Sequence, residues 1–301
     1  MVTVSGKILT DLVNNLPNKN ISIQSKESGL SIEAENYHTN IKTLPADEFP
    51  LIPEVEGKSV LSLDSQELKI ALDQVVFAAA SNQTQPEISG VLFACEGGDL
   101  RIVGTDRYRL AEKTILLPAS PGTVLEAIVP QKTCVELSRV IGNQKGSVEM
   151  RFSETQVAIN FNETQIISRL VDGQYPDYRQ IIPTSFATTS VIEKNSLVNA
   201  LRAAMVFGQN NNSVQMSFSK ERQQVVLTAE SADLGKSVVE LPTKTEGEDG
   251  SLVLNSHYLL DCLSGVGSQN IIIKMIDDNS PSLVVPEDKK DYIYLVMPIK
   301  S

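Results

Sequence analysis

The sequence predicts an α+β fold built from tandem repeats of one unit. A short amphipathic helix recurs three times, beginning at Lys7, Lys132 and His257, so that its copies lie 125 residues apart. Strand-like runs follow each copy, and a second amphipathic helix occurs twice, 129 residues apart. Self-similarity at a fixed period indicates a repeated structural unit. We therefore expect a unit of about 120–125 residues with the order helix, strands, helix, strands.

The first type of helix has an acidic residue at the same place in each copy: Asp11, Glu136 and Asp261. Its apolar residues recur at the spacing of one helical face, which is typical of a helix that covers a core. Three strand-like runs then follow. They are ISIQSK, GLSIEA and NIKTL in the first copy, SVEMRFS, TQVAIN and QIISRL in the second, and NIIIKMI, SLVVPE and YIYLVMP in the third.

The second type of helix is expected in residues 63–79 and 192–207. Apolar residues share one helical face in each copy, with Leu68 and Leu72 in the first and Leu197 in the second. A pair of strand-like runs follows each copy, over residues 90–106 and 213–231. Gly-Gly-Asp interrupts the first pair and Lys-Glu-Arg the second, which predicts a turn within each pair.

Counting the units divides the chain into three domains. Residues 58–183 form one unit and residues 184–301 another. Residues 1–57 match only the second half of a unit, so we expect the first half of the first domain to be missing. A domain of this size cut through its sheet should have low stability.

The composition restricts the class of protein. With 41% hydrophobic and 21% charged residues, the chain can form a packed core. A net charge of −11 argues against a protein that binds nucleic acid with its whole surface, although a local basic lining remains possible. The three cysteines form no C-x-x-C pair, which fits a reduced, cytoplasmic compartment. No run of about 18 apolar residues and no signal peptide are present, so we expect no contact with a membrane.

Residue patterns typical of catalysis are missing. The histidines, His38 and His257, lie in no Ser or Cys motif that suggests a triad. Gly265-Val266-Gly267 lacks the third glycine of a dinucleotide site and follows a helix, and no phosphate-binding loop of the Walker type occurs. Asp172 and Asp177 flank a turn, where aspartate commonly bonds to the local backbone. We therefore expect no enzyme activity, no cofactor and no metal.

Three separated motifs, in the right order, resemble the bacterial DNA polymerase III beta subunit family, the sliding clamps. The segment GVLFACEGGDLRIVGTDRYRLA (90–111) is similar to the family's strand-turn-strand and Thr-Asp-x-x-Arg-Leu segment. LVDGQYPDYRQIIP (170–183) is similar to its linker between the second and third domains, and YLVMPIKS (294–301) to its C-terminal tail. The resemblance covers essentially the whole chain.

This resemblance implies tandem clamp-type domains, each with two helices packed on antiparallel sheets, that form part of a ring. In the family, two three-domain subunits close head to tail around duplex DNA, with helices lining the hole. The implied function is that of a non-catalytic processivity factor in DNA replication. The implied partners are duplex DNA, the DNA polymerase III alpha subunit, the clamp loader, other proteins with a clamp-binding motif, and a second copy in a homodimer.

The resemblance also implies residues for a groove that binds partner peptides. Carried over position by position, the groove residues are Ile88, Thr105, Arg107, Tyr108, Arg109, Leu110, Pro176, Ile181, Met297, Pro298 and Ile299. Arg107 stands where the family usually has a small residue such as Gly or Ser. A groove of aliphatic side chains with a methionine suits several peptides.

Two further sets of residues follow from the helices and the resemblance together. The residues expected to face DNA are Lys69, Lys132, Arg139 and Arg202. The residues expected at the contact between two copies are Met205 and Val206, opposite a strand in residues 36–41. A second interpretation stays open, in which the chain is a truncated peptide-binding adaptor that no longer closes a ring. The mass in solution distinguishes the two.

Overall fold

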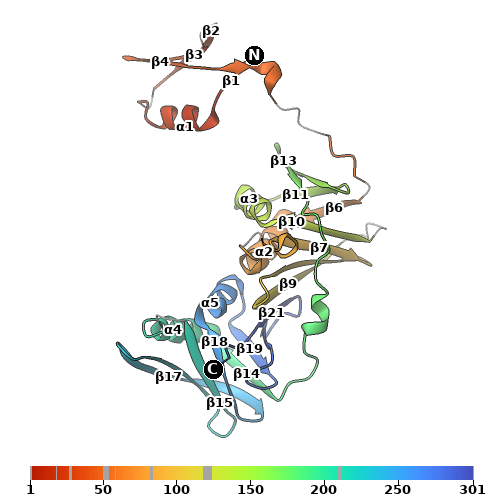
Figure 1. The fold of residues 1–301 in the computed structure, drawn as a ribbon, viewed down its shortest axis with the longest axis vertical. Helices are drawn as coiled ribbons and strands as arrows, with labels where there is room; N and C mark the ends of the chain where they lie inside the picture. The colour runs from red at the N-terminus through yellow and green to blue at the C-terminus, as the bar shows by residue number, and fades with distance from the viewer. Residues whose placement is uncertain are drawn as a thin grey trace. The chain divides into compact units, whose positions relative to one another are not determined.

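The computed structural model describes residues 2–17, 19–26, 29–49, 54–57, 59–81, 84–117, 124–208 and 212–300. The chain divides into two compact units, residues 1–54 and 55–301, which we call the N-terminal unit and the C-terminal unit (Figure 1). In both, helices pack on antiparallel sheets. The predicted α+β class is therefore confirmed.

The N-terminal unit contains one α-helix among its described residues. Its elements are β1 (Val2–Thr3), α1 (Gly6–Asn14), β2 (Ser22–Lys26), β3 (Gly29–Ala34), β4 (Tyr37–Ile41), β5 (Leu44–Pro45) and a 3₁₀ turn at Ala46–Glu48. Strands β2, β3 and β4 form an antiparallel sheet in this order, and β1 pairs with β5. The core consists of Leu30, Ile32 and Ile41, against which Leu9 and Leu12 of α1 pack.

Two predictions concern the third strand of this unit: the strand expected in residues 36–41 agrees with the structure, whereas the run NIKTL is displaced. The sequence run NIKTL suggested a strand over residues 40–44, whereas β4 spans Tyr37–Ile41. Glu35 adopts a positive φ of 46°, which is the conformation of a tight turn. The chain therefore reverses in two residues, and Tyr37 already pairs with Ala34.

The C-terminal unit holds the remaining elements. Its helices are α2 (Ser65–Val75), α3 (Gln131–Ile141), α4 (Lys194–Met205) and α5 (Ser256–Gly265). Its strands are β6 (Ser59–Asp64), β7 (Gly90–Glu96), β8 (Asp99–Thr105), β9 (Arg109–Leu116), β10 (Leu125–Pro130), β11 (Ser147–Phe152), β12 (Gln156–Phe161), β13 (Thr164–Arg169), β14 (Thr188–Glu193), β15 (Ser213–Ser219), β16 (Gln224–Ser231), β17 (Gly235–Gly247), β18 (Gly250–Asn255), β19 (Asn270–Met275), β20 (Ser282–Pro286) and β21 (Tyr292–Val296). Short 3₁₀ turns lie at Val76–Ala78, Pro86–Ile88 and Tyr178–Ile181.

One sheet runs through both halves of the C-terminal unit. The described strands form a 12-stranded sheet in the order β10-β7-β8-β9-β21-β20-β19-β14-β17-β16-β15-β18, and a four-stranded sheet in the order β13-β12-β11-β6. The joint is the antiparallel pair of β9 and β21, in which Leu110 lies opposite Leu295 and Lys113 opposite Tyr292. The last strand of the chain is therefore hydrogen-bonded to a strand about 180 residues earlier.

Side chains just before three of the helices fix where those helices begin. Asp64 Oδ1 accepts hydrogen bonds from the N–H groups of Gln66 (2.9 Å) and Glu67 (3.0 Å) at the start of α2. Glu193 does the same for α4, and Asn255 for α5. Such caps satisfy backbone donors that a helix leaves unpaired.

The four helices of the C-terminal unit lie along one side of it, in the order α3, α2, α5, α4, and the strands lie behind them (Figure 1). The predicted apolar faces are buried: Leu68 and Leu72 of α2 and Leu197 and Leu201 of α4 are all inaccessible. These residues belong to one continuous core beneath the helices. The opposite faces of the helices are left for solvent or for a ligand.

Candidate functional site

The turn between β8 and β9 carries the Thr-Asp-x-x-Arg-Leu motif and is held by its own side chains. Asp106 Oδ1 accepts hydrogen bonds from the N–H groups of Tyr108 and Arg109, both at 3.0 Å. Thr105 Oγ1 donates to the carbonyl of Arg109 at 2.7 Å. Arg107 has a φ of +79°, where glycine is unstrained and most side chains are disfavoured. The turn geometry thus gives a physical reason for the small residue that the resemblance leads one to expect at this position.

Arg109 fastens this turn to α5. Its guanidinium donates to Asp106 (2.9 Å), to Asp261 of α5 (2.5 Å) and to the carbonyl of Phe77 (2.8 Å). The rings of Phe77 and Tyr258 lie 5.4 and 4.3 Å from its central carbon, within the range of cation–π attraction. Burial lowers the pKa of Arg109, but the bonds to Asp261 and Asp106 outweigh this, so the pKa is raised. The side chain is 12% exposed and forms part of the wall of the site.

The C-terminal tail extends the pairing of β21 with β9 by one bond and then bonds to β18. Met297 N–H donates to the carbonyl of Tyr108 at 2.8 Å, and Ile299 N–H donates to the carbonyl of Val253 at 2.8 Å. Met297 and Ile299 are half-buried and Pro298 is buried. The tail and the turn, predicted from distant motifs, therefore lie next to each other.

A cavity of about 720 Å³ opens beside the turn. Four predicted groove residues line it: Ile88, Arg107, Tyr108 and Arg109. Ile88 is buried in its wall, whereas the ring of Tyr108 is 63% exposed. Most of the other lining residues are polar, so the exposed ring of Tyr108 is the part of this cavity best suited to contact with an apolar side chain of a partner.

The remaining predicted groove residues lie on the linker side of the sheet. Leu110 belongs to an apolar cluster with Tyr178 and Leu295. Pro176 lines a separate cavity of about 360 Å³. Ile181 lies on the 3₁₀ turn Tyr178–Ile181 and is half exposed. The structure therefore brings the turn and the tail together but does not place Pro176 in the cavity that contains Ile88.

Sequence reasoning missed the residues that hold the turn in place. Phe77 and Tyr258 were assigned only to helices, and Asp261 was noted only as the acidic residue that the helix repeat shares. Asp261 is 152 residues away from Arg109, so no local pattern connects the two. The one usable signal was that repeated acid, although its copies do not share a role: Arg139 of the same helix donates to Glu136, whereas Asp261 accepts from the distant Arg109.

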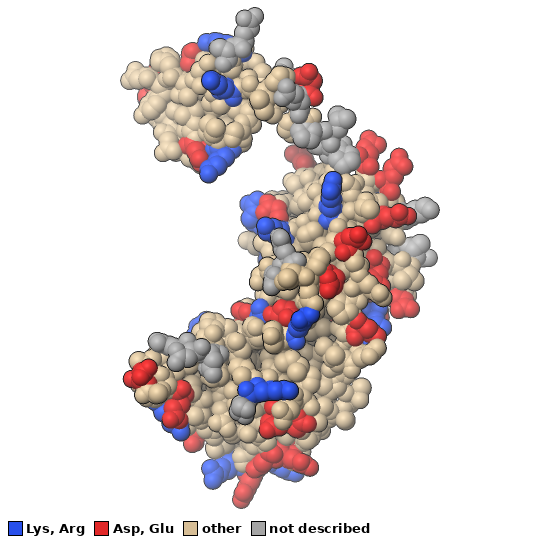
Figure 2. Space-filling view, in the orientation of Figure 1, with Lys and Arg blue, Asp and Glu red and all other residues tan. Residues whose placement is uncertain are grey.

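The predicted DNA-facing residues all lie on the helical side of the C-terminal unit. They are Lys69 on α2, Lys132 and Arg139 on α3, and Arg202 on α4. Lys69 pairs with Asp73, and Arg139 Nε donates to Glu136 at 2.9 Å. In Figure 2, positive and negative residues are mixed on this side, whereas acidic residues gather over β7 and β10 on the other side of the unit. The helical side therefore carries weak, partly neutralised positive charge.

The residues predicted to contact a second copy lie at the end of α4. Met205 is the last residue of the helix and is half-buried. Val206 follows it and is 58% exposed. A large exposed aliphatic side chain at a helix end is compatible with a contact surface.

Groups with metal-binding or nucleophilic chemistry do not gather within the described ranges. No cluster of three or more His, Cys, Asp or Glu residues that could hold a metal ion is found there. Cys95, Cys134 and Cys262 are buried and free, and burial raises the pKa of Cys262 to about 12, so its thiol is a poor nucleophile. In the same ranges, no helix is both long enough and apolar enough to cross a membrane.

Comparison with known families matches three consecutive domain models to this chain. The N-terminal domain of the DNA polymerase III beta subunit matches residues 1–53, its central domain residues 62–177, and its C-terminal domain residues 179–300. Among individual relatives, the beta sliding clamp of a Synechocystis species is 29% identical over 99% of this chain and 82% of its own length. The beta sliding clamp of Bacillus subtilis is 25% identical over 100% and 80%, respectively.

Solved structures give the same result. The DNA polymerase III beta subunit of Thermotoga maritima has a TM-score of 0.91 at 27% identity, covering 100% of this chain and 81% of its own. A DNA polymerase sliding clamp from Pseudomonas aeruginosa has a TM-score of 0.92 at 27% identity, covering 100% and 82%. These comparisons do not support the expectation that the first half of the first domain is missing. Because the three domain models match in order along nearly the whole length, the chain belongs to the DNA polymerase III beta subunit family.

Proposed function

We propose that this protein is a DNA sliding clamp, a processivity factor that encircles duplex DNA and tethers a replicative polymerase to it. The observation that carries the proposal is the row of four helices on one side of the C-terminal unit, with Lys69, Lys132, Arg139 and Arg202 on them. Mixed charge on this side suits sliding, because non-specific phosphate contacts have to be weak and salt-sensitive.

The proposed role is non-catalytic, and processivity comes from topological linkage to DNA. The buried cysteines, with raised pKa values for Cys134 and Cys262, support this view, since neither thiol is available as a nucleophile. The protein needs no cofactor for this role. Its place of action is the cytoplasm, where bacterial DNA is replicated.

The peptide groove is proposed at the turn of residues 105–110 and the tail of residues 297–299. Met297 and Tyr108 are joined through their backbones, and the ring of Tyr108 is exposed beside the cavity that Ile88 lines. The proposed occupants are short motifs of the DNA polymerase III alpha subunit, of the clamp loader and of other proteins with a clamp-binding motif. Pro176 and Ile181 would extend the groove toward the linker, whereas Leu110 is buried and supports the groove from the core.

The ring is proposed to close between two copies of the chain, with Met205 and Val206 of one copy against strand β4 of the other. The alternative, an adaptor that binds peptides without closing a ring, is not favoured, because all three domains of the family match. Light scattering distinguishes the two. We expect a mass of about twice 32.8 kDa, whereas a mass of 32.8 kDa at every concentration would favour the adaptor.

Primer extension tests the function itself. The assay uses a long primed single-stranded circle, with the polymerase and clamp loader of the same cell. We expect the protein to lengthen the products of single binding events by a large factor, and to do so only when the clamp loader is present. Products of unchanged length would rule out the proposed function.

A further inference from the structure

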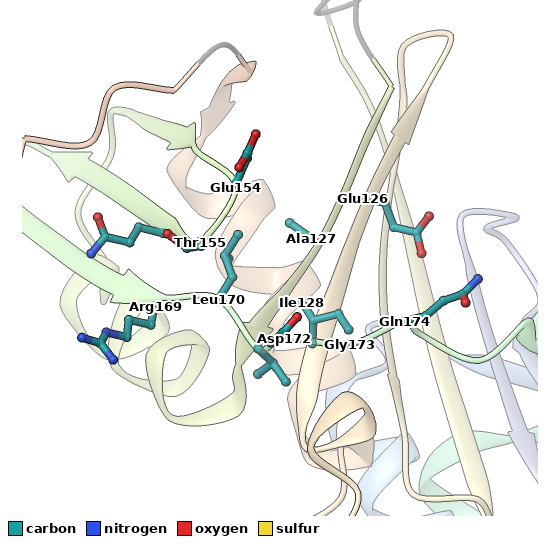
Figure 3. Close-up of a pocket in the computed structure, with 12 residues that line it drawn as sticks. Glu126, Ala127, Ile128, Glu154, Thr155, Arg169, Leu170, Asp172, Gly173 and Gln174 are labelled. Atoms are coloured by element: carbon teal, nitrogen blue, oxygen red, sulfur yellow. The ribbon is translucent and has the colours of Figure 1, made fainter.

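A further cavity lies away from the proposed groove, on the strand side of the C-terminal unit. It has a volume of about 890 Å³ and lies between β10, the turn that joins β11 to β12, and the chain that follows β13. Figure 3 shows Glu154 and Leu170 on one side of this space and Ala127 of β10 on the other. We call it the β10 groove.

Strand β10 ends the 12-stranded sheet and has a free edge along this groove. On its other side it pairs with β7 from Leu125 to Pro130. The carbonyl of Ile128 points away from β7, because it accepts a hydrogen bond from Val171 N–H at 2.8 Å. Since backbone groups alternate in direction along an antiparallel strand, those of Glu126 also point into the groove. The structure gives them no backbone partner within its described residues.

A free strand edge is a template for pairing with another strand. Main-chain hydrogen bonds to such an edge supply affinity, and the neighbouring side chains supply specificity. Within the described residues, the linker bonds to this edge through Val171 and Ile128, and β13 also packs near β10. The space beside Glu126 therefore has both the room and the backbone donors and acceptors that an added strand requires.

The charge around the groove selects among possible partners. Three carboxylates belong to its lining, those of Glu126, Glu154 and Asp172, and none of the three forms an ion pair within the described part of the chain. In Figure 3 the side chain of Glu126 lies across β10 from Glu154, beside Gln174, so the backbone of Glu126 faces the groove while its carboxylate lies at the rim. The one cation in the lining is Arg169, whose side chain points away from the space in Figure 3. A second copy of β10 would bring Glu126 against Glu126, which is unfavourable across paired strands. Acidic charge on an edge thus discourages self-pairing but attracts a basic strand.

We propose that the β10 groove binds an extended, lysine- or arginine-rich segment of a partner protein, which adds to the free edge of β10 as a further strand. Its basic side chains lie near Glu126, Glu154 and Asp172, and its backbone pairs with that of Glu126. This surface is separate from the peptide groove beside Tyr108, so one clamp has two kinds of docking site. The proposal does not depend on ring closure or on contact with DNA.

The test is fluorescence polarisation at low salt with a labelled eight-residue peptide of alternating lysine and valine. We expect saturable binding that the double variant Glu126→Lys and Asp172→Lys weakens about tenfold. The control is Glu163→Lys, an exposed acid in the turn between β12 and β13, which reverses one acidic charge outside the groove and so makes half of the change in net charge. It should leave the affinity within about twofold, and circular dichroism should show that all variants are folded.

Backbone methylation of the peptide separates strand addition from mere charge attraction. N-methyl groups on alternate residues remove the donors that face β10 in one register, so that peptide should lose binding, whereas methylation of the other set should not. No saturable binding to the wild-type protein would overturn the proposal. So would equal binding by both methylated peptides, or equal loss in the Glu163→Lys control.

Discussion

Helix α1 with strands β2–β4 and helix α3 with strands β11–β13 have the same sequence pattern, but they differ greatly in burial. None of the nine residues of α1 is buried, whereas α3 buries Cys134, Leu137 and Ile141. Helix α3 packs against α2 and against strands β10 and β7, whereas α1 is the only α-helix among the described residues of its unit. The pattern thus specifies the element, and the neighbours decide how much stability the element contributes.

The largest effect expected from this difference is on the free energy of unfolding. Leu72→Ala in α2 empties a fully buried site and should cost about 3 kcal/mol. Leu12→Ala in α1, which is only partly buried, should cost about 1 kcal/mol or less. Urea denaturation followed by hydrogen exchange in each unit measures both losses, since the two units need not unfold together. Equal losses at the two sites would contradict the comparison.

Breaking an ion pair should also cost more stability in the C-terminal unit than in the N-terminal unit. Arg109→Ala leaves Asp106 and Asp261 without their partner in a mostly buried site, and should destabilise the C-terminal unit by about 2 kcal/mol. Lys19→Ala breaks an exposed pair with Glu35 in the N-terminal unit and should change stability by less than about 0.5 kcal/mol. Thermal unfolding compares them. If both variants behave alike, Arg109 does not hold the turn.

A third prediction concerns binding at the proposed groove. Met297→Ala removes apolar surface beside Tyr108. It should weaken the binding of a labelled polymerase-derived Q-x-x-L-F-type peptide by about 2 kcal/mol, or roughly thirtyfold in affinity. Fluorescence polarisation measures the affinity. Lys69→Glu, on the helical side, and Leu12→Ala, in the N-terminal unit, are controls that should bind as the wild type does. Equal binding by all variants would show that the tail does not form part of the groove.

The smallest effect is expected on the affinity for duplex DNA when charges on the helical side are reversed. Reversing the charge of both Arg139 and Arg202 should reduce the slope of log affinity against log salt by about 2, because each phosphate contact contributes roughly one unit. The double variant Lys19→Glu and Lys26→Glu in the N-terminal unit makes the same change in net charge and serves as the control. Coincident slopes for the wild type and the double variant would show that these arginines do not face DNA.

The sequence predicted the repeated helices well because periodic apolar residues are a local signal. The helices expected from Lys7, Lys132 and His257 begin at Gly6, Gln131 and Ser256, each one residue earlier. The strand pairs over 90–106 and 213–231 are also confirmed. The strand expected in residues 36–41 matches β4, whereas the run NIKTL lies too late in the chain, because the turn before β4 uses a glutamate at positive φ, which residue type does not signal.

The arrangement of the candidate site could not be predicted in the same way. The turn and the tail were named from a resemblance, but their contact depends on the pairing of β9 with β21, which no local pattern encodes. The hydrogen bonds of Arg109 to Asp261 and Phe77 likewise join distant parts of the chain. Side-chain chemistry is visible in a sequence, whereas long-range pairing has to be seen in the fold.

Retention on circular DNA tests the central claim most directly. The protein is loaded onto a nicked circular plasmid by its clamp loader, separated by gel filtration, and separated again after one restriction enzyme has linearised the plasmid. We predict that the protein elutes with the circle and is lost from the linear form, because a ring can slide off an end. Equal retention on both forms would show binding by contact and would contradict a sliding clamp, as would loss from both.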